Sequence, residues 1–102
     1  MNLEDKMNFI LNKRKKLNLN DDYGIQKSWE EIIEVLSKNE ENTLSYLKNC
    51  NKEDLYRISE VFEDLAESLH SKELINCLRK LDEKYPDLEM TNDIDKAESY
   101  IE

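Results

Sequence analysis

The chain of 102 residues contains few of the residues that interrupt or cross-link a fold, with one glycine, one proline, one histidine and two cysteines. So few glycines and prolines favour helices joined by short polar loops. Cys50 and Cys77 form no CxxC pair, and a single histidine offers no set of zinc ligands. We therefore expect two reduced thiols that act as small apolar filler, and no metal ion or other cofactor.

Long apolar runs are also missing. The longest is Phe9-Ile10-Leu11, far shorter than a membrane span. The segment from Met1 to Lys6 lacks the charged-then-apolar pattern of a secretory signal. The expectation is a cytoplasmic protein that does not enter a membrane.

Acidic residues outnumber basic residues, and the formal net charge is −9. Residues 1–51 carry eight Lys and Arg against nine Asp and Glu, whereas residues 52–102 carry seven against fifteen. Such a surface repels nucleic acid and attracts basic proteins by long-range steering, so direct nucleic-acid binding is not expected. The basic run Lys13-Arg14-Lys15-Lys16 is interpreted as a solvated helix end that suits the negative end of the helix dipole.

Apolar residues recur at helical spacing in six segments. Five residues are predicted as helix N-caps, and they are Asn2, Ser28, Asn51, Ser71 and Thr91. A third helix is expected from Glu40 to Asn49, and a helix that starts at Ser71 is expected to stop at Pro86. The predicted domain is 1–102, with an N-terminal helix at 1–17, a loop at 18–27 and a helical core at 28–102. The fold class is all-α, a compact single domain of about five to six antiparallel helices stacked as helical hairpins.

The stretch from Asn51 to Leu69 is the central helix of this prediction. Its apolar residues follow the i, i+3, i+4, i+7 spacing of one buried face, and they are Leu55, Ile58, Phe62, Leu65 and Leu69. Four acids follow the same spacing on the opposite side, with an aromatic residue beside them. The predicted partner-binding residues are therefore Tyr56, Glu60, Glu63, Asp64 and Glu67.

Catalysis is not expected. Acid–base chemistry needs carboxylates whose environments differ, and carboxylates on one solvated helix face have similar environments. The chain shows no nucleophile–base pair. One stripe of carboxylates about 5.4 Å apart is too sparse to imitate duplex DNA, which presents a charge about every 1.7 Å. Mimicry is limited to a few phosphates.

Three segments carry a family resemblance. They are Ser28-Trp29-Glu30-Glu31-Ile32-Ile33, the stretch from Asn51-Lys52-Glu53-Asp54-Leu55 into Val61-Phe62-Glu63-Asp64-Leu65, and Leu81-Asp82-Glu83-Lys84-Tyr85-Pro86. Their order between Ser28 and Ile101 resembles small all-helical immunity proteins of bacterial polymorphic-toxin and contact-dependent growth inhibition systems. The resemblance implies a cytoplasmic protein that binds and neutralises one cognate toxin domain, such as a nuclease with a basic groove.

A second function remains open, that of a cytosolic helical adaptor or regulatory domain that binds proteins and inhibits nothing. Either way the expected partner is a protein, and the chain is expected to be a monomer before it forms a complex. Affinity separates the two, because an immunity protein needs nanomolar or tighter binding whereas an adaptor functions at micromolar affinity.

Overall fold

The computed structural model describes residues 2–101, which form helices and no strand. The α-helices are α1 (Leu3–Lys16), α2 (Asp22–Leu36), α3 (Glu40–Asn49), α4 (Lys52–Ile58), α5 (Phe62–Leu69), α6 (Lys72–Lys84) and α7 (Thr91–Ser99). Two 3₁₀ segments, η1 (Ser59–Val61) and η2 (Pro86–Leu88), complete the helical structure of these residues. The predicted all-α single domain is confirmed, while its two terminal residues, Met1 and Glu102, lie outside the described residues.

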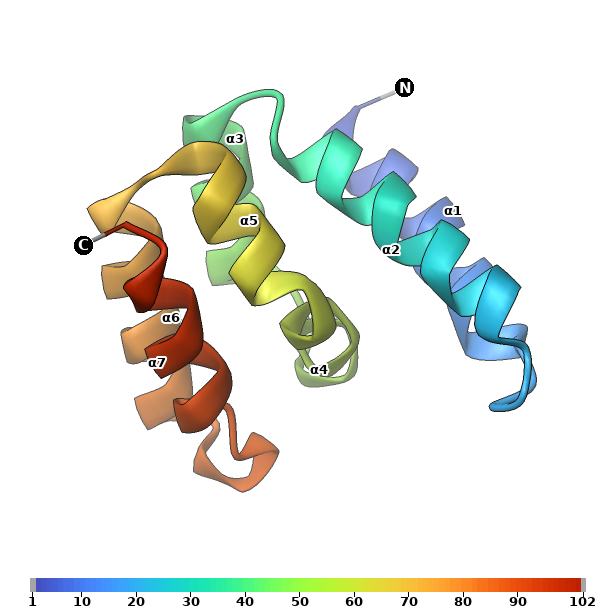
Figure 1. Ribbon diagram of the computed structural model, residues 1–102. Coiled ribbons are helices and arrows are strands. Elements are labelled where there is room, and N and C mark those ends of the chain that lie inside the picture. The colour runs from blue at the N-terminus through green and yellow to red at the C-terminus, as the bar shows by residue number, and fades with distance from the viewer. Residues whose placement is uncertain (1, 102) are drawn as a thin grey trace.

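The helices form two layers (Figure 1). In the nearer layer α2, α5 and α7 lie side by side, and α1, α3 and α6 lie behind them. The consecutive pairs α1–α2 and α6–α7 are hairpins that join the two layers. Packing then departs from chain order, because α5 packs mainly against α7 and α3 packs mainly against α6. The short helix α4 is seen almost end-on below α5.

Three of the predicted caps are confirmed. The side-chain oxygen of Asn2 accepts from the Asp5 backbone N–H at 2.8 Å, and Asn51 does the same for Asp54 at 2.8 Å. Ser71 caps α6 through the Leu74 N–H at 3.0 Å. Helix α3 has the predicted bounds, and α6 stops two residues before Pro86. Local side-chain chemistry therefore sets these helix ends.

The predicted loop at 18–27 is wrong, because α2 begins at Asp22. Asp21 is the cap, and its Oδ1 accepts from the Gly24 N–H at 2.9 Å. A Cβ on Gly24 would lie 2.7 Å from Asp21 Oδ2, so the absence of a side chain lets the carboxylate approach closely. Ser28 lies inside α2 and its hydroxyl donates to the Ile25 carbonyl, so Ser28 is not an N-cap.

The predicted cap at Thr91 is also wrong. Thr91 is the first residue of α7, and Met90 precedes it as a cap without a side-chain hydrogen bond. The Thr91 hydroxyl instead donates to Asp82 Oδ2 at 2.6 Å. This bond ties the start of α7 to the end of α6.

The predicted central helix is not continuous. It consists of α4, the 3₁₀ segment η1 and α5, and Val61 leaves the helical region with φ −120° and ψ 16°. The Ser59 hydroxyl donates to the Tyr56 carbonyl at 2.6 Å, a local bond that competes with regular helical bonding. With the chain redirected here, the adjacent residues Val61 and Phe62 are both fully buried.

The core lies between the two layers, and Phe62 is its bulkiest fully buried side chain. Cys77 is buried among apolar neighbours, as the filler role predicts, while Cys50 is half-buried. Both are free thiols. Trp29 is partly buried and packs against the core.

Candidate protein-binding surface

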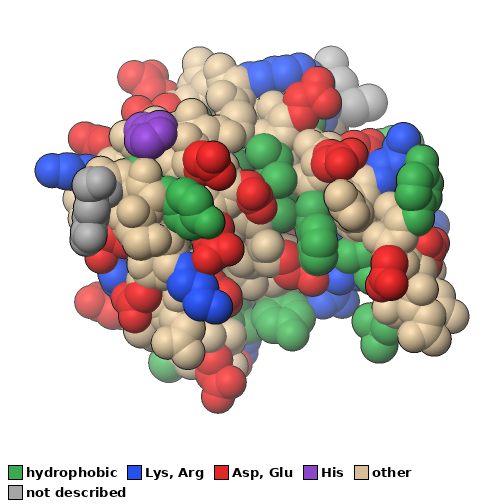
Figure 2. Space-filling model, in the orientation of Figure 1, with side chains coloured by type: hydrophobic (Ala, Val, Ile, Leu, Met, Phe, Trp, Pro, Cys, Tyr) green, Lys and Arg blue, Asp and Glu red, His purple; other side chains and the backbone are tan. Residues whose placement is uncertain are grey.

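Three of the predicted partner-binding residues lie together on α5. Glu63, Asp64 and Glu67 occupy the side of α5 opposite the buried residues Phe62 and Leu65, so their carboxylates point outward. Figure 2 shows acidic side chains spread across the face that α2, α5 and α7 present. We call Glu63, Asp64 and Glu67 the α5 acidic surface.

The α5 acidic surface has no cationic partner within the part of the chain that the structure describes. The ion pairs formed by residues 2–101 involve other carboxylates, and none includes these three side chains. Glu63 and Glu67 stand one helical turn apart, where like charges repel by a few tenths of a kcal/mol. This charge is therefore uncompensated in the isolated domain.

Glu60 does not belong to the α5 acidic surface. It lies in η1, and its Oε2 accepts from Arg14 Nη2 at 2.9 Å across 46 residues of sequence. Arg14 is only 8% exposed, so this pair is partly shielded from water. The expectation that one helix projects all four carboxylates to one side is wrong, because η1 interrupts the helix and Arg14 engages Glu60.

Tyr56 is half-exposed, but it lies on α4. The helical spacing that placed it beside the acids assumed a continuous helix, and the break at η1 removes that relation. The guanidinium carbon of Arg57 lies 5.6 Å from the centroid of the Tyr56 ring. Tyr56 is therefore exposed, but helical spacing no longer places it beside the α5 acids.

The basic run lies in the last turn of α1, as expected, but only Lys13 and Lys16 are exposed, whereas Arg14 is buried. The first three cations of the run reach carboxylates on other elements, through the pairs Lys13–Glu31 at 3.2 Å, Arg14–Glu60 at 2.9 Å and Lys15–Asp54 at 3.1 Å. Lys15 also contacts Glu53 at 3.6 Å, and the Asp54 hydrogen bond, the largest influence, raises the pKa of Lys15. We call this set the α1 ion-pair belt. These partners could not be identified from the sequence, because they lie 18 to 46 residues away along the chain.

Metal and thiol chemistry find no support in the geometry. No group of three or more His, Cys, Asp or Glu in residues 2–101 is arranged to hold a metal ion. Burial raises the pKa of the Cys50 thiol to about 12 and also raises that of Cys77, which makes both poor nucleophiles. His70 is exposed and ends α5 in a left-handed conformation, with φ 46°.

Comparison with known proteins identifies no relative, since no family model, curated protein or solved structure matches the chain. None of the helices in the described residues combines the length and apolar character that a bilayer crossing requires.

Proposed function

We propose that the protein binds a basic protein domain through the α5 acidic surface and neutralises a cognate bacterial toxin domain in the cytoplasm, as an immunity protein. One observation carries this proposal, namely the uncompensated charge of Glu63, Asp64 and Glu67. Some carboxylates, such as Glu60 and Asp54, are paired with cations within the fold, whereas these three stand together on one helix face without such a partner among residues 2–101. A partner that brings positive charge would complete the same pairing on α5.

The physical gain comes in two parts. Carboxylates that repel one another in the free protein lose that repulsion when a positive groove approaches. Long-range attraction between the net charge of −9 and a basic domain also speeds encounter. Both contributions weaken as salt is added, so the complex should form more slowly at high ionic strength.

The proposal assigns the chain a binding role and no catalytic step. The inhibitor acts as a monomer that covers a basic substrate groove, and the α5 carboxylates take the place of a few substrate phosphates. The alternative role, a non-inhibitory helical adaptor, uses the same surface at lower affinity. A dissociation constant in the nanomolar range or below favours the inhibitor, whereas a micromolar value favours the adaptor.

The decisive experiment is charge reversal by Glu63→Lys together with Asp64→Lys. The proposal predicts that a basic toxin domain is encoded beside the gene, and the protein is coexpressed with that domain while survival and association rate are measured. We expect protection to be lost, and association to slow by roughly tenfold or more at low salt. Because the two residues lie in the first turn of α5, each reversal also costs about 0.3–1 kcal/mol of stability through the helix dipole.

The chain supplies a matched control, Glu40→Lys together with Glu41→Lys. These residues occupy the first turn of α3, in the other layer, and neither takes part in an ion pair within residues 2–101. The control makes the same change in net charge at the same helix position, so it should cost similar stability yet keep protection. Full protection by the α5 variant, or equal loss in both variants, contradicts the proposal.

A further inference from the structure

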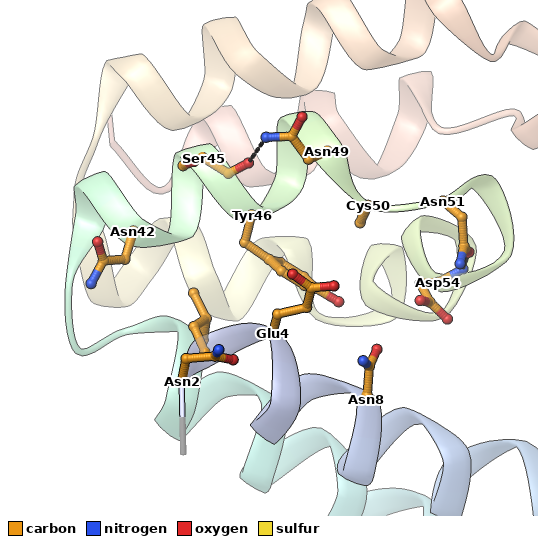
Figure 3. A pocket seen from close by; sticks show the side chains of 11 residues that line it. Asn2, Glu4, Asn8, Asn42, Ser45, Tyr46, Asn49, Cys50, Asn51 and Asp54 are labelled. Atoms are coloured by element: carbon orange, nitrogen blue, oxygen red, sulfur yellow. Dashed lines mark hydrogen bonds between the residues drawn. The ribbon is translucent and has the colours of Figure 1, made fainter.

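A pocket of about 500 Å³ lies between α1, α3 and the start of α4. Figure 3 shows Glu4 and Asn8 rising from α1 toward α3, with Tyr46 of α3 and Asp54 of α4 on the opposite side. The three residues of the α5 acidic surface are not among those that line it. The pocket is therefore a feature separate from the surface assigned to the protein partner.

The charged residues that line the pocket are both acidic. Glu4 and Asp54 line it, and no lysine or arginine does. Asp54 is 7% exposed, and its Oδ1 lies 3.1 Å from Lys15 Nζ. Because Lys15 is shared with Glu53, one ammonium serves two carboxylates at this edge. A molecule entering the pocket therefore meets net negative charge. Burial raises the pKa of both Tyr46 and Cys50, and the nearby Asp54 carboxylate raises both further.

The neutral lining of the pocket is rich in amides. The Asn49 Nδ2 donates a hydrogen bond to the Ser45 carbonyl at 2.8 Å, which leaves the Asn49 Oδ1 available as an acceptor. Asn8 and Asn42 add two amides whose side chains form no hydrogen bond within residues 2–101. The Tyr46 hydroxyl is buried at the wall without a hydrogen-bond partner in the described chain. The Tyr46 hydroxyl is the buried group among these, and a buried hydroxyl without a partner favours a polar ligand. The three amides are exposed, so a ligand would replace the water that hydrates them.

We propose that this pocket binds a small organic cation, a molecule that carries ammonium or guanidinium groups on a short chain. Glu4, which forms no ion pair within residues 2–101, supplies the charge that selects a cation over an anion, and Asp54 adds the part of its charge that Lys15 does not neutralise. The amide oxygens of Asn8, Asn42 and Asn49 accept hydrogen bonds from its N–H groups, since ammonium and guanidinium are donors without acceptors. The volume suits a molecule larger than a metal ion, because ligand pockets are typically about 300–1,000 Å³.

Titration followed by nuclear magnetic resonance tests this proposal on the isolated protein. Agmatine and spermidine are the probes, and the side-chain amide signals of Asn8, Asn42 and Asn49 are the readout. We expect saturable shifts of these signals and none at Asn12, which is exposed on α1 outside the pocket. The neutral diol 1,4-butanediol and the dianion glutarate should produce no saturable shift.

Two variants assign the binding to the pocket. Glu4→Gln should weaken agmatine binding by roughly fivefold to tenfold, because it removes one nearby carboxylate. Glu41→Gln changes the charge equally at an exposed α3 residue outside the pocket and should leave binding unchanged. The proposal is overturned if the shifts do not saturate below about 10 mM, a limit weaker than ordinary specific binding, or if both variants weaken binding equally.

The outcome is independent of the proposed toxin partner. The variant that reverses Glu63 and Asp64 should bind agmatine like the wild-type protein, and Glu4→Gln should keep full protection against the toxin. Loss of agmatine binding in the α5 variant would mean that diffuse negative charge, rather than the pocket, attracts the probe.

Discussion

The α1 ion-pair belt and the α5 acidic surface are two charged regions that differ in whether their carboxylates are paired with cations. In the belt, cations of α1 meet carboxylates that lie 18 to 46 residues further along the chain. On α5, three carboxylates stand together without a cation among residues 2–101. Glu60 and Glu63 are only three residues apart, yet they fall on different sides of this division. The comparison shows that an acid's role depends on what the tertiary fold brings to it, and that neighbours in sequence need not share it.

Truncation of a core side chain should have the largest effect on stability. Phe62 is fully buried where η1 meets α5, so Phe62→Ala leaves a cavity that neighbours fill only in part. We expect a loss of about 3–5 kcal/mol in the free energy of unfolding, measured by urea denaturation. A loss below about 1 kcal/mol would be typical of an exposed site and would contradict this position for Phe62.

Breaking the belt at its most buried pair should have the next largest effect. Arg14→Met removes the partner of Glu60, and we expect a loss of about 1–3 kcal/mol, less than for a fully buried pair because Glu60 can regain water. The matched change Glu63→Gln on α5 should stay within about 0.5 kcal/mol.

A double-mutant cycle sharpens this contrast. Arg14→Met with Glu60→Gln should show a clear coupling energy, and Arg14→Met with Glu63→Gln should be additive within about 0.5 kcal/mol. Additivity in both cycles would mean that the Arg14–Glu60 contact contributes nothing and that the two regions do not differ.

Charge reversal should change stability in opposite directions in the two regions. Glu67→Lys places a cation one turn after Glu63 and near the C-terminal end of α5, so it should stabilise the protein by about 0.5 kcal/mol. Glu60→Lys places the same charge beside Arg14 and should destabilise it by more than about 1 kcal/mol. Thermal melting of both variants at low salt measures the difference, and a shift of the same sign in both would remove the distinction between the regions.

The helices and much of the core could be predicted because their causes are local. The spacing of Leu74, Ile75, Leu78 and Leu81 predicts a buried face on α6, and all four are buried. The errors came where two local signals competed. Ser28 is a plausible cap followed by acidic residues, yet Asp21 with Gly24 starts α2 earlier. Thr91 likewise bonds Asp82 across a turn that its own sequence does not reveal.

The candidate site was less predictable than the fold. Helical spacing alone grouped Tyr56 and Glu60 with Glu63, Asp64 and Glu67, because a continuous helix repeats every 3.6 residues. The break at η1 ends that register. The pocket between α1 and α3 could not be foreseen at all, since Glu4 and Asp54 lie far apart in the sequence and only packing brings them to one cavity.

By itself the sequence determined an acidic, all-helical domain, the caps at Asn2, Asn51 and Ser71, and a buried Phe62, because these follow from charge, side-chain hydrogen bonding and periodicity within a few residues. Only the tertiary structure decided which carboxylates are engaged. Ion pairs across layers need two helices to pack at one separation and angle, and that geometry depends on the whole core. Arg14 therefore engages Glu60 and leaves the α5 acidic surface uncompensated.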